Sequence, residues 1–92
     1  MARCIVVNLR RQPYDVYIGR GSKWGNPFRQ QNTSLIERDR VCDAYEEYFW
    51  TTDLPNQLEE LRGKRLGCYC KPQRCHGDFL AKIVNERFGD DA

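Results

Sequence analysis

The chain has 92 residues, enough for one domain with a single modest core. Its hydrophobic and charged fractions, 40% and 30%, are those of an ordinary globular protein and exclude a disordered or fibrous chain. No apolar run approaches the roughly 20 residues that a membrane span needs. No charged-then-apolar leader follows Met1, so we expect an intracellular protein without a membrane partner.

The net charge of +2 conceals an uneven distribution along the chain. Residues 1–30 carry a net charge of +5, residues 31–61 carry −6, and residues 62–92 carry +3. Both basic segments contain loops that we consider functional below, and such loops suit a phosphate-bearing partner. A helix with a solvated acidic face, balanced elsewhere by chance, explains the same distribution without any ligand.

Two short strands and a long loop are predicted in the first third of the chain. Residues 4–9 form a β-branched apolar run that predicts a buried strand, and residues 15–18 predict a second one. Residues 19–33 have no periodicity, and this is a long loop for so small a domain. Because Trp24 and Phe28 argue against disorder, we expect this loop to be functional.

Two helices are expected next. Ser34 and Glu37 have the spacing of a capping box and predict a helix that runs to about residue 50. A shorter helix is expected from about Pro55 to Gly63. Helical spacing assigns to the buried faces Ile36, Val41, Tyr45, Tyr48 and Phe49 in the longer helix, and Leu58 and Leu61 in the shorter one.

The last third of the chain predicts a strand followed by a helix. Residues 65–70 form the strand, in which alternation puts Leu66, Cys68 and Cys70 on one face. The helix is expected from about residue 75 to residue 87, and its inward residues are Phe79, Leu80, Ile83, Val84 and Phe88.

The order of these elements predicts a single α/β domain over residues 1–92. We expect a small Rossmann-like sandwich, in which about three helices pack against a three- or four-stranded sheet. Residues 90–92 are expected to fray. A second copy of so short a chain would help to complete a pocket, so a homo-oligomer is also considered.

Three of the five cysteines and the only histidine fall within nine residues: Cys68, Cys70, Cys75 and His76. Thiolates and imidazole bind metals or act as nucleophile and base, and packing alone rarely concentrates them so closely. One interpretation is a structural Cys₃His zinc site that uses all four residues. Its difficulty is that neighbouring side chains on a helix diverge by roughly 100°.

A reactive thiolate is the second interpretation of this segment. Cys75 lies where the last helix is expected to begin, and helix N-termini stabilise anions. Lys71 and Arg74 add positive charge, while His76 or Asp78 would act as base or orienting group. The third interpretation is simple burial of the cysteines. We favour a functional, metal-free site, and we assign Cys4 and Cys42 to the core because they lie in apolar patterns.

The loop after the second strand is the other segment with candidate binding residues. Glycines let a backbone approach a phosphate, Arg20 and Lys23 would neutralise its charge, and Trp24 would stack on a base. The spacing is neither the dinucleotide fingerprint nor a Walker loop, and an ordinary turn with packed aromatics explains it equally well. The candidate binding residues are Gly19, Arg20, Gly21, Ser22, Lys23, Trp24 and Asn26.

Two motifs, in residues 16–28 and residues 61–78, resemble the family called domain of unknown function 4326, which occurs in bacteria and their phages. The similarity covers about residues 5–84 and implies no established reaction. A second family, domain of unknown function 488, is distantly similar but has an acidic residue where Cys70 stands, which weighs against a four-ligand zinc site. The hallmark positions that the resemblance implies are Gly19, Arg20, Gly21, Ser22, Lys23, Trp24, Gly25, Asn26, Pro27, Cys68, Cys70, Pro72, Cys75, His76, Gly77 and Asp78.

We therefore expect loop 19–26 and turn 68–78 to meet at the ends of neighbouring strands and form one pocket. The pocket would bind a nucleotide, a nucleobase derivative or a nucleic acid, and Cys75, His76 and Asp78 would carry out hydrolysis or group transfer. The alternative is a non-catalytic nucleic-acid-binding module with zinc on Cys68, Cys70, Cys75 and His76.

A third hypothesis is a phage-type protein that inhibits a host protein. It predicts an exposed apolar or acidic patch, on the helix over residues 34–50, rather than a pocket. The resemblance implies a cytoplasmic location, in a bacterium or in the bacterial host of a phage.

Overall fold

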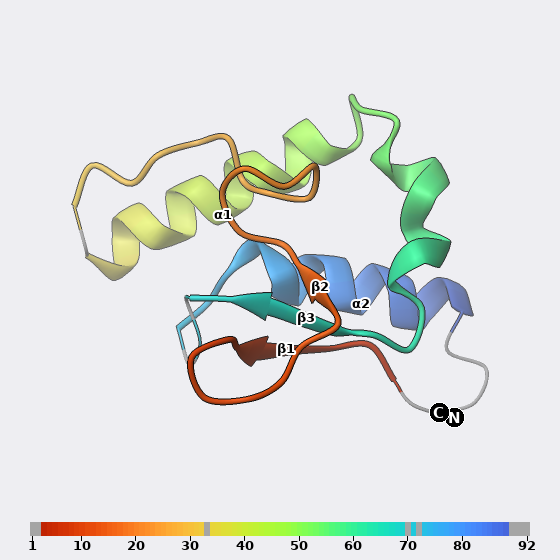
Figure 1. Ribbon diagram of the computed structural model, residues 1–92. Helices are drawn as coiled ribbons and strands as arrows, with labels where there is room; N and C mark the ends of the chain where they lie inside the picture. Colours follow the sequence, from red (N-terminus) through yellow and green to blue (C-terminus); the bar gives the residue numbers. More distant parts are fainter. Residues whose placement is uncertain (1–2, 33, 70, 72, 89–92) are drawn as a thin grey trace.

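The structure is a computed structural model that describes residues 3–32, 34–69, 71 and 73–88. Three parallel strands form one sheet in the order β1-β3-β2: β1 (Ile5–Asn8), β2 (Val16–Tyr17) and β3 (Arg65–Cys68). In the register of the sheet, Leu66 of β3 lies between Val6 and Val16. Because the strands are parallel, their carboxyl ends meet at one edge of the sheet (Figure 1).

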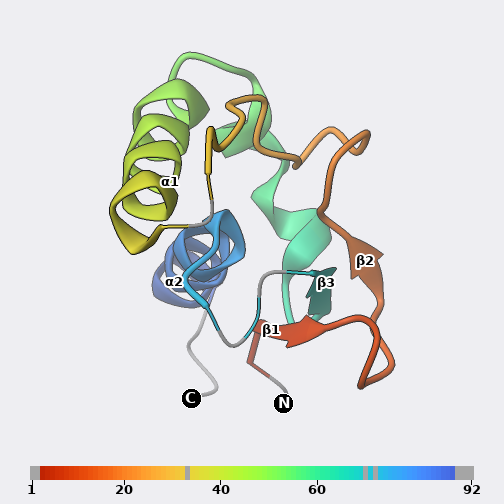
Figure 2. The same cartoon turned by 90° about the vertical axis from the view of Figure 1, so that its left-hand side faces the viewer.

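Helices cover one face of this sheet. Helix α2 (His76–Phe88) packs on β1 and β3, and α1 (Leu35–Phe49) packs on α2. The 3₁₀ helix η1 (Leu54–Leu61) connects α1 to β3 and contacts α2. Figure 2 shows α1 and α2 on the same side of the sheet. Within the described residues, the helices are all too short or too polar to cross a membrane.

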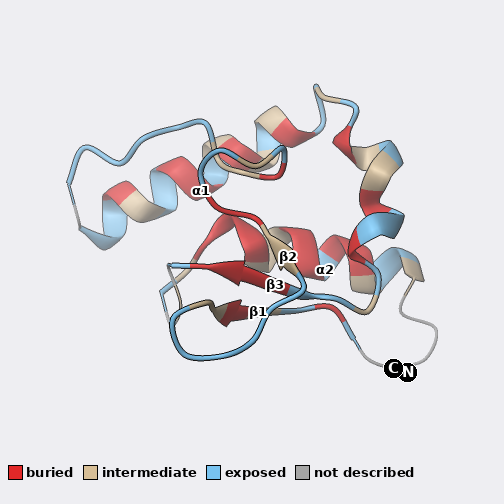
Figure 3. Cartoon of the chain, viewed as in Figure 1, coloured by how far each residue is buried: buried red, intermediate tan, exposed pale blue. Residues whose placement is uncertain are grey.

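The core lies between the sheet and the helices, and every element contributes buried or partly buried apolar residues to it. Figure 3 shows by colour which parts of each element are buried. Apolar burial of this kind is the main favourable term for folding. Tyr45 and Phe49 of α1 form an aromatic cluster with Phe79 of α2. The largest fully buried side chains are Tyr45, Phe49, Ile18, Leu58, Leu61, Leu66, Leu80 and Val84.

The predicted α/β class and the number of helices are confirmed, and the sheet has three strands. The narrower description as Rossmann-like stays a prediction. The expected fraying of residues 90–92 and the expected place of Cys70 in a strand concern positions outside the described residues.

Two details of α1 differ from the prediction. Ile36 is 84% exposed, because the first turn of the helix extends beyond the surface of α2 and the core contact starts further along. The capping box is only half formed. The Ser34 hydroxyl accepts from the Glu37 N–H at 3.1 Å, but the Glu37 carboxylate binds Arg40 and the Gln31 N–H instead of the Ser34 backbone. These bonds lower the pKa of Glu37 to about 2.

Candidate functional site

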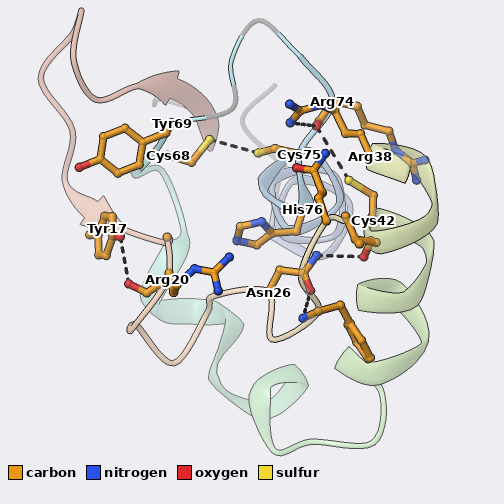
Figure 4. A pocket seen from close by; sticks show the side chains of 14 residues that line it. Tyr17, Arg20, Asn26, Arg38, Cys42, Cys68, Tyr69, Arg74, Cys75 and His76 are labelled. Atoms are coloured by element: carbon orange, nitrogen blue, oxygen red, sulfur yellow. Dashed lines mark hydrogen bonds between the residues drawn. The ribbon is translucent and has the colours of Figure 1, made fainter. Parts of the chain in front are cut away.

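A cavity of about 400 Å³ lies at the carboxyl ends of β2 and β3 (Figure 4). Its walls come from the loop after β2, the end of β3, the turn before α2 and one face of α1. The carboxyl edge of a parallel sheet is where α/β proteins usually bind ligands. The predicted meeting of the two motifs is confirmed, since both contribute to the walls: Gly19, Arg20 and Asn26 from the first, and Cys68, Cys75 and His76 from the second.

Cys75 occupies the N-cap position of α2, directly before the first helical residue. Its Sγ accepts a hydrogen bond from the Gly77 N–H at 3.2 Å, as an N-cap side chain does. The same sulfur lies 3.2 Å from the Cys68 Sγ at the end of β3. Backbone N–H groups at a helix start favour a negative charge, so the fold places this sulfur where a thiolate would be stabilised.

His76 is the first residue of α2, and its imidazole is fixed by the end of β2. Its Nε2 lies 2.7 Å from the carbonyl oxygen of Ile18. A carbonyl oxygen can only accept a hydrogen bond, so Nε2 carries the proton in this arrangement. The ring also packs against Tyr45, with 4.9 Å between the ring centroids. In this tautomer Nδ1 carries no proton.

Asp78 acts on Cys75 through the backbone. Its Oδ2 accepts from the Cys75 N–H at 3.1 Å, which completes the reciprocal capping box that α1 lacks. Its other oxygen forms an ion pair with Lys71. Burial alone would lower the pKa of Lys71, but this ion pair raises it above the usual value. Asp78 lines a second hollow, between α1 and α2, rather than the cavity, so we assign it a positioning role instead of the predicted catalytic one.

Four residues of the predicted binding loop do not line the cavity. Trp24 is only 2% exposed because its indole packs in the core, so the predicted stacking role is wrong. The Lys23 ammonium binds Glu60 and Gln57 of η1 instead of facing the cavity. The Ser22 hydroxyl donates a hydrogen bond to the Gly19 carbonyl at 2.8 Å. Gly21, with a φ of 92°, forms the exposed turn of the loop.

Two hydrogen bonds, one of them buried, anchor the loop to α1. The Tyr45 hydroxyl donates to the Trp24 carbonyl at 2.9 Å. The Asn26 side chain donates to the Val41 carbonyl and accepts from the Phe28 N–H, both at 2.9 Å. Asn26 thus shapes the wall of the cavity, although we predicted that it binds the ligand.

Several wall residues were missed from the sequence. Arg38 lines the cavity together with Val41 and Cys42, at helical spacing on one face of α1. This spacing was the available signal for Arg38. Cys42 is buried as predicted, but it belongs to the wall as well as to the core. The aromatic residues of the walls are Tyr17, Phe28 and Tyr69.

Arg74 joins the turn before α2 to α1. Its guanidinium binds Asp39, Asp43 and Glu46 at 2.9 to 3.1 Å. Asp43 foremost, and then Asp39, raise the pKa of Arg74 above its ordinary value. The acidic face of α1 is therefore partly neutralised within the chain, which weakens the hypothesis of an acidic docking patch. Leu35, Ile36 and Trp50 remain exposed at the two ends of the helix.

The zinc alternative stays a prediction. Cys70, one of its four ligands, lies outside the described residues. The residues that are described contain no group of three or more histidine, cysteine or acidic side chains arranged for a metal ion. Nε2 of His76 is bound to the Ile18 carbonyl, so this nitrogen would have to give up that bond to become a zinc ligand. Cys4 is confirmed as a core residue, and burial raises its pKa to about 11.

Comparison with known proteins identifies related sequences of viral origin. Residues 6–86 match the profile of a family described as a domain of unknown function, DUF4326. The chain is 41% identical over 93 residues to an uncharacterised 12.4 kDa protein of the nrdA-td intergenic region of Enterobacteria phage T4, which covers 96% of this chain and 83% of that protein. It is 35% identical over 107 residues to the uncharacterised protein R718 of Acanthamoeba polyphaga mimivirus, covering 90% of this chain and 81% of that protein. No solved structure matches the chain.

Proposed function

Since the chain belongs to the DUF4326 family, whose description states no activity, we propose from the cavity that it binds a nucleotide or a nucleotide unit of a nucleic acid. The observation that carries this proposal is a wall in which arginines and aromatic rings surround Cys75 and His76. Such a combination recognises a phosphate and a flat base together.

The charges of the cavity support an anionic ligand. Arg20, Arg38 and Arg74 line it, and no acidic side chain among the described residues does. Arg74 is neutralised by the carboxylates of α1. In the described part of the chain, neither Arg20 nor Arg38 has a carboxylate within ion-pair distance. A phosphate would supply that missing charge, and arginine binds it through two parallel hydrogen bonds.

The aromatic lining supports a base next to that phosphate. Tyr17, Phe28 and Tyr69 line the cavity, and the last two are 38% and 55% exposed. These rings take the role that we first predicted for Trp24. A volume of about 400 Å³ falls within the range of small-molecule sites.

Cys75 and His76 carry the catalytic part of the proposal, which is hydrolysis or group transfer. The Cys75 thiol gives its proton to the His76 imidazole and attacks an electrophilic atom of the ligand. A bond to sulfur forms while the bond to the leaving group breaks, and the leaving group takes the proton from the imidazole. Water or a second acceptor then displaces the sulfur, and its proton returns through the imidazole to the thiolate.

Binding is tested by calorimetric titration with nucleoside monophosphates and with the corresponding nucleosides. We expect the monophosphates to bind more tightly, and Arg20→Ala and Arg38→Ala each to weaken them about tenfold, as the loss of a charge-assisted hydrogen bond does. Lys23→Ala is the matched control, because it removes a positive charge from the same loop outside the cavity. Equal weakening by all three variants would refute the binding site.

Catalysis is tested separately, by mass spectrometry of nucleotides and short oligonucleotides incubated with the protein. We expect Cys75→Ser and His76→Gln to abolish product formation while ligand affinity stays within about threefold of the wild type. Unchanged turnover in both variants would remove the catalytic part and leave the binding part intact.

A further inference from the structure

We propose that the ligand is one nucleotide within a single strand of nucleic acid, and that the loop after β1 binds the neighbouring nucleotide. This inference rests on the proposed function and specifies its ligand. It concerns a second surface at the carboxyl edge of the sheet, where Arg10 lies over Tyr69 of the cavity wall and Arg11 follows Arg10 in the loop.

Tyr69 connects the cavity to this surface. It follows β3 directly, lines the cavity, and is 55% exposed. The Arg10 guanidinium lies over its ring, 5.0 Å from the centroid. A stacked tyrosine and arginine form the kind of platform on which bases of single strands stack. The ring is thus shared between the cavity and the loop outside it.

Asn8, the last residue of β1, holds the loop in this position. Its side chain donates to the Lys71 carbonyl at 2.8 Å and accepts from the Arg10 N–H at 2.9 Å. Its own carbonyl accepts from the N–H groups of Arg11 and Gln12 at 2.9 and 3.1 Å. One residue therefore links the arginine loop to the turn that leads to Cys75, so this surface is organised before any ligand binds.

The charges indicate a second phosphate. Arg10 and Arg11 are exposed, and neither has a carboxylate within ion-pair distance in the described residues. Arg20 and Arg38 line the cavity, where the proposed function assigns them to one phosphate. Two further arginines outside it exceed what a mononucleotide needs and match the repeated charge of a strand.

The enclosed half of the site favours a single strand over a duplex. Cys75 and His76 are 2% and 8% exposed, so a base must enter the cavity to reach them. A base in a duplex is stacked and paired, and extruding it has an energetic cost that a single strand avoids.

The test compares a single-stranded oligonucleotide of about eight nucleotides with a nucleoside monophosphate, by fluorescence anisotropy and calorimetry at several salt concentrations. We expect the strand to bind at least about tenfold more tightly than the monophosphate. Arg10→Ala/Arg11→Ala should reduce the salt slope of strand binding by about 1.4, because each lost phosphate contact removes about 0.7. The same variant should leave monophosphate binding unchanged.

Two further variants complete the test. Tyr69→Ala should weaken strand binding about tenfold through the loss of stacking. Arg3→Ala/Lys64→Ala removes two positive charges that precede β1 and β3, at the opposite edge of the sheet, and should leave the salt slope nearly unchanged. Thermal unfolding of each variant shows that it is folded.

Each contrary result refutes a specific part of the proposal. If strand and monophosphate bind equally, or if the Arg10/Arg11 variant leaves the salt slope intact, the second binding position is refuted and the proposed function stands. Tighter binding of a duplex than of the strand refutes the single-strand assignment. If neither ligand binds, the proposed function itself is refuted.

Discussion

The N-termini of α1 and α2 have the same capping-box spacing in the sequence but different local structures. At α1, a serine is followed three residues later by Glu37, and at α2, a cysteine is followed three residues later by Asp78. The Ser34 hydroxyl caps its helix on the outside of the molecule. The Cys75 sulfur caps α2 inside it, beside a second sulfur and in the wall of the cavity.

The capping side chains of α1 and α2 differ in how strongly they stabilise a helix. A hydroxyl is a strong hydrogen-bond acceptor and among the best N-caps, whereas a thiol is a weak one. Stability alone would therefore favour serine at position 75 as well. The reciprocal bond from Asp78 compensates in part, because it fixes the backbone of the weaker cap. The cysteine at α2 is thus a weaker cap than a serine would be, and it is the residue that the proposed chemistry requires.

The largest expected effect is on the free energy of unfolding. It is seen by comparing Gly77, the second residue of α2, with Ile36, the second residue of α1. A Cβ added to Gly77 would lie 2.6 Å from the Ile18 Cδ1 and 3.1 Å from both Val6 methyl groups. Since Ile18 is fully buried, Gly77→Ala should lower the free energy of unfolding by about 2 kcal/mol through overpacking. The matched Ile36→Ala should change it by less than about 0.5 kcal/mol, because Ile36 is exposed. Urea denaturation measures both, and equal effects would contradict the packing described here.

Ser34→Ala tests the cap of α1. We expect a loss of about 1 kcal/mol in the free energy of unfolding, since the Glu37 N–H loses its partner. Ligand affinity should stay unchanged, because Ser34 does not line the cavity. A loss of affinity with preserved stability would mean that this helix start takes part in binding.

Cys75→Ser tests the cap of α2, and here the expectation is reversed. Serine restores a strong capping oxygen, so the free energy of unfolding should stay within about 0.5 kcal/mol of the wild type. Turnover should be lost, as described above. A large loss of stability would show that the sulfur is required for packing rather than for chemistry.

The last expected effect is a pH dependence that originates at the start of α1. The pKa of Glu37 is lowered to about 2 by its bonds to Arg40 and the Gln31 N–H. A carboxyl with a lowered pKa stabilises the folded state above its unfolded pKa of about 4.3, and this stabilisation is lost as the pH falls toward 2. Glu37→Gln should remove that part of the acid dependence. NMR titration of the Glu37 carboxyl checks the value directly, and an ordinary midpoint would contradict it.

Local sequence patterns were sufficient to predict the strands and helices, and to predict that the two motifs lie side by side. The β-branched run before residue 9 and the helical spacing before residue 50 predict β1 and α1 closely. The cavity follows from topology, because parallel strands bring the segments after β2 and β3 to the same edge. Two motifs far apart in sequence therefore had to become neighbours.

The roles of single side chains depended on contacts that the sequence does not encode locally. A tryptophan in a glycine-rich loop looks the same whether it stacks on a ligand or fills the core, and Trp24 does the latter. Lys23 finds Glu60 on η1, and only the folded chain brings these two residues together. Helical spacing groups Arg38 with Val41 and Cys42, but only the folded chain shows that this face of α1 borders a cavity.

The buried hydrogen bond from the Tyr45 hydroxyl to the Trp24 carbonyl holds the loop after β2 in place. This attachment is separate from the side chains that the loop contributes to the cavity. The acceptor is a backbone atom and the donor is a core residue, so the attachment does not depend on the side chains that line the cavity. Arg20 or Phe28 can then be substituted, which changes the wall of the cavity, while the backbone of the loop keeps its place. Tyr45→Phe keeps the ring and deletes the hydrogen-bond donor. It would weaken the attachment of the loop without substituting any residue of the cavity wall.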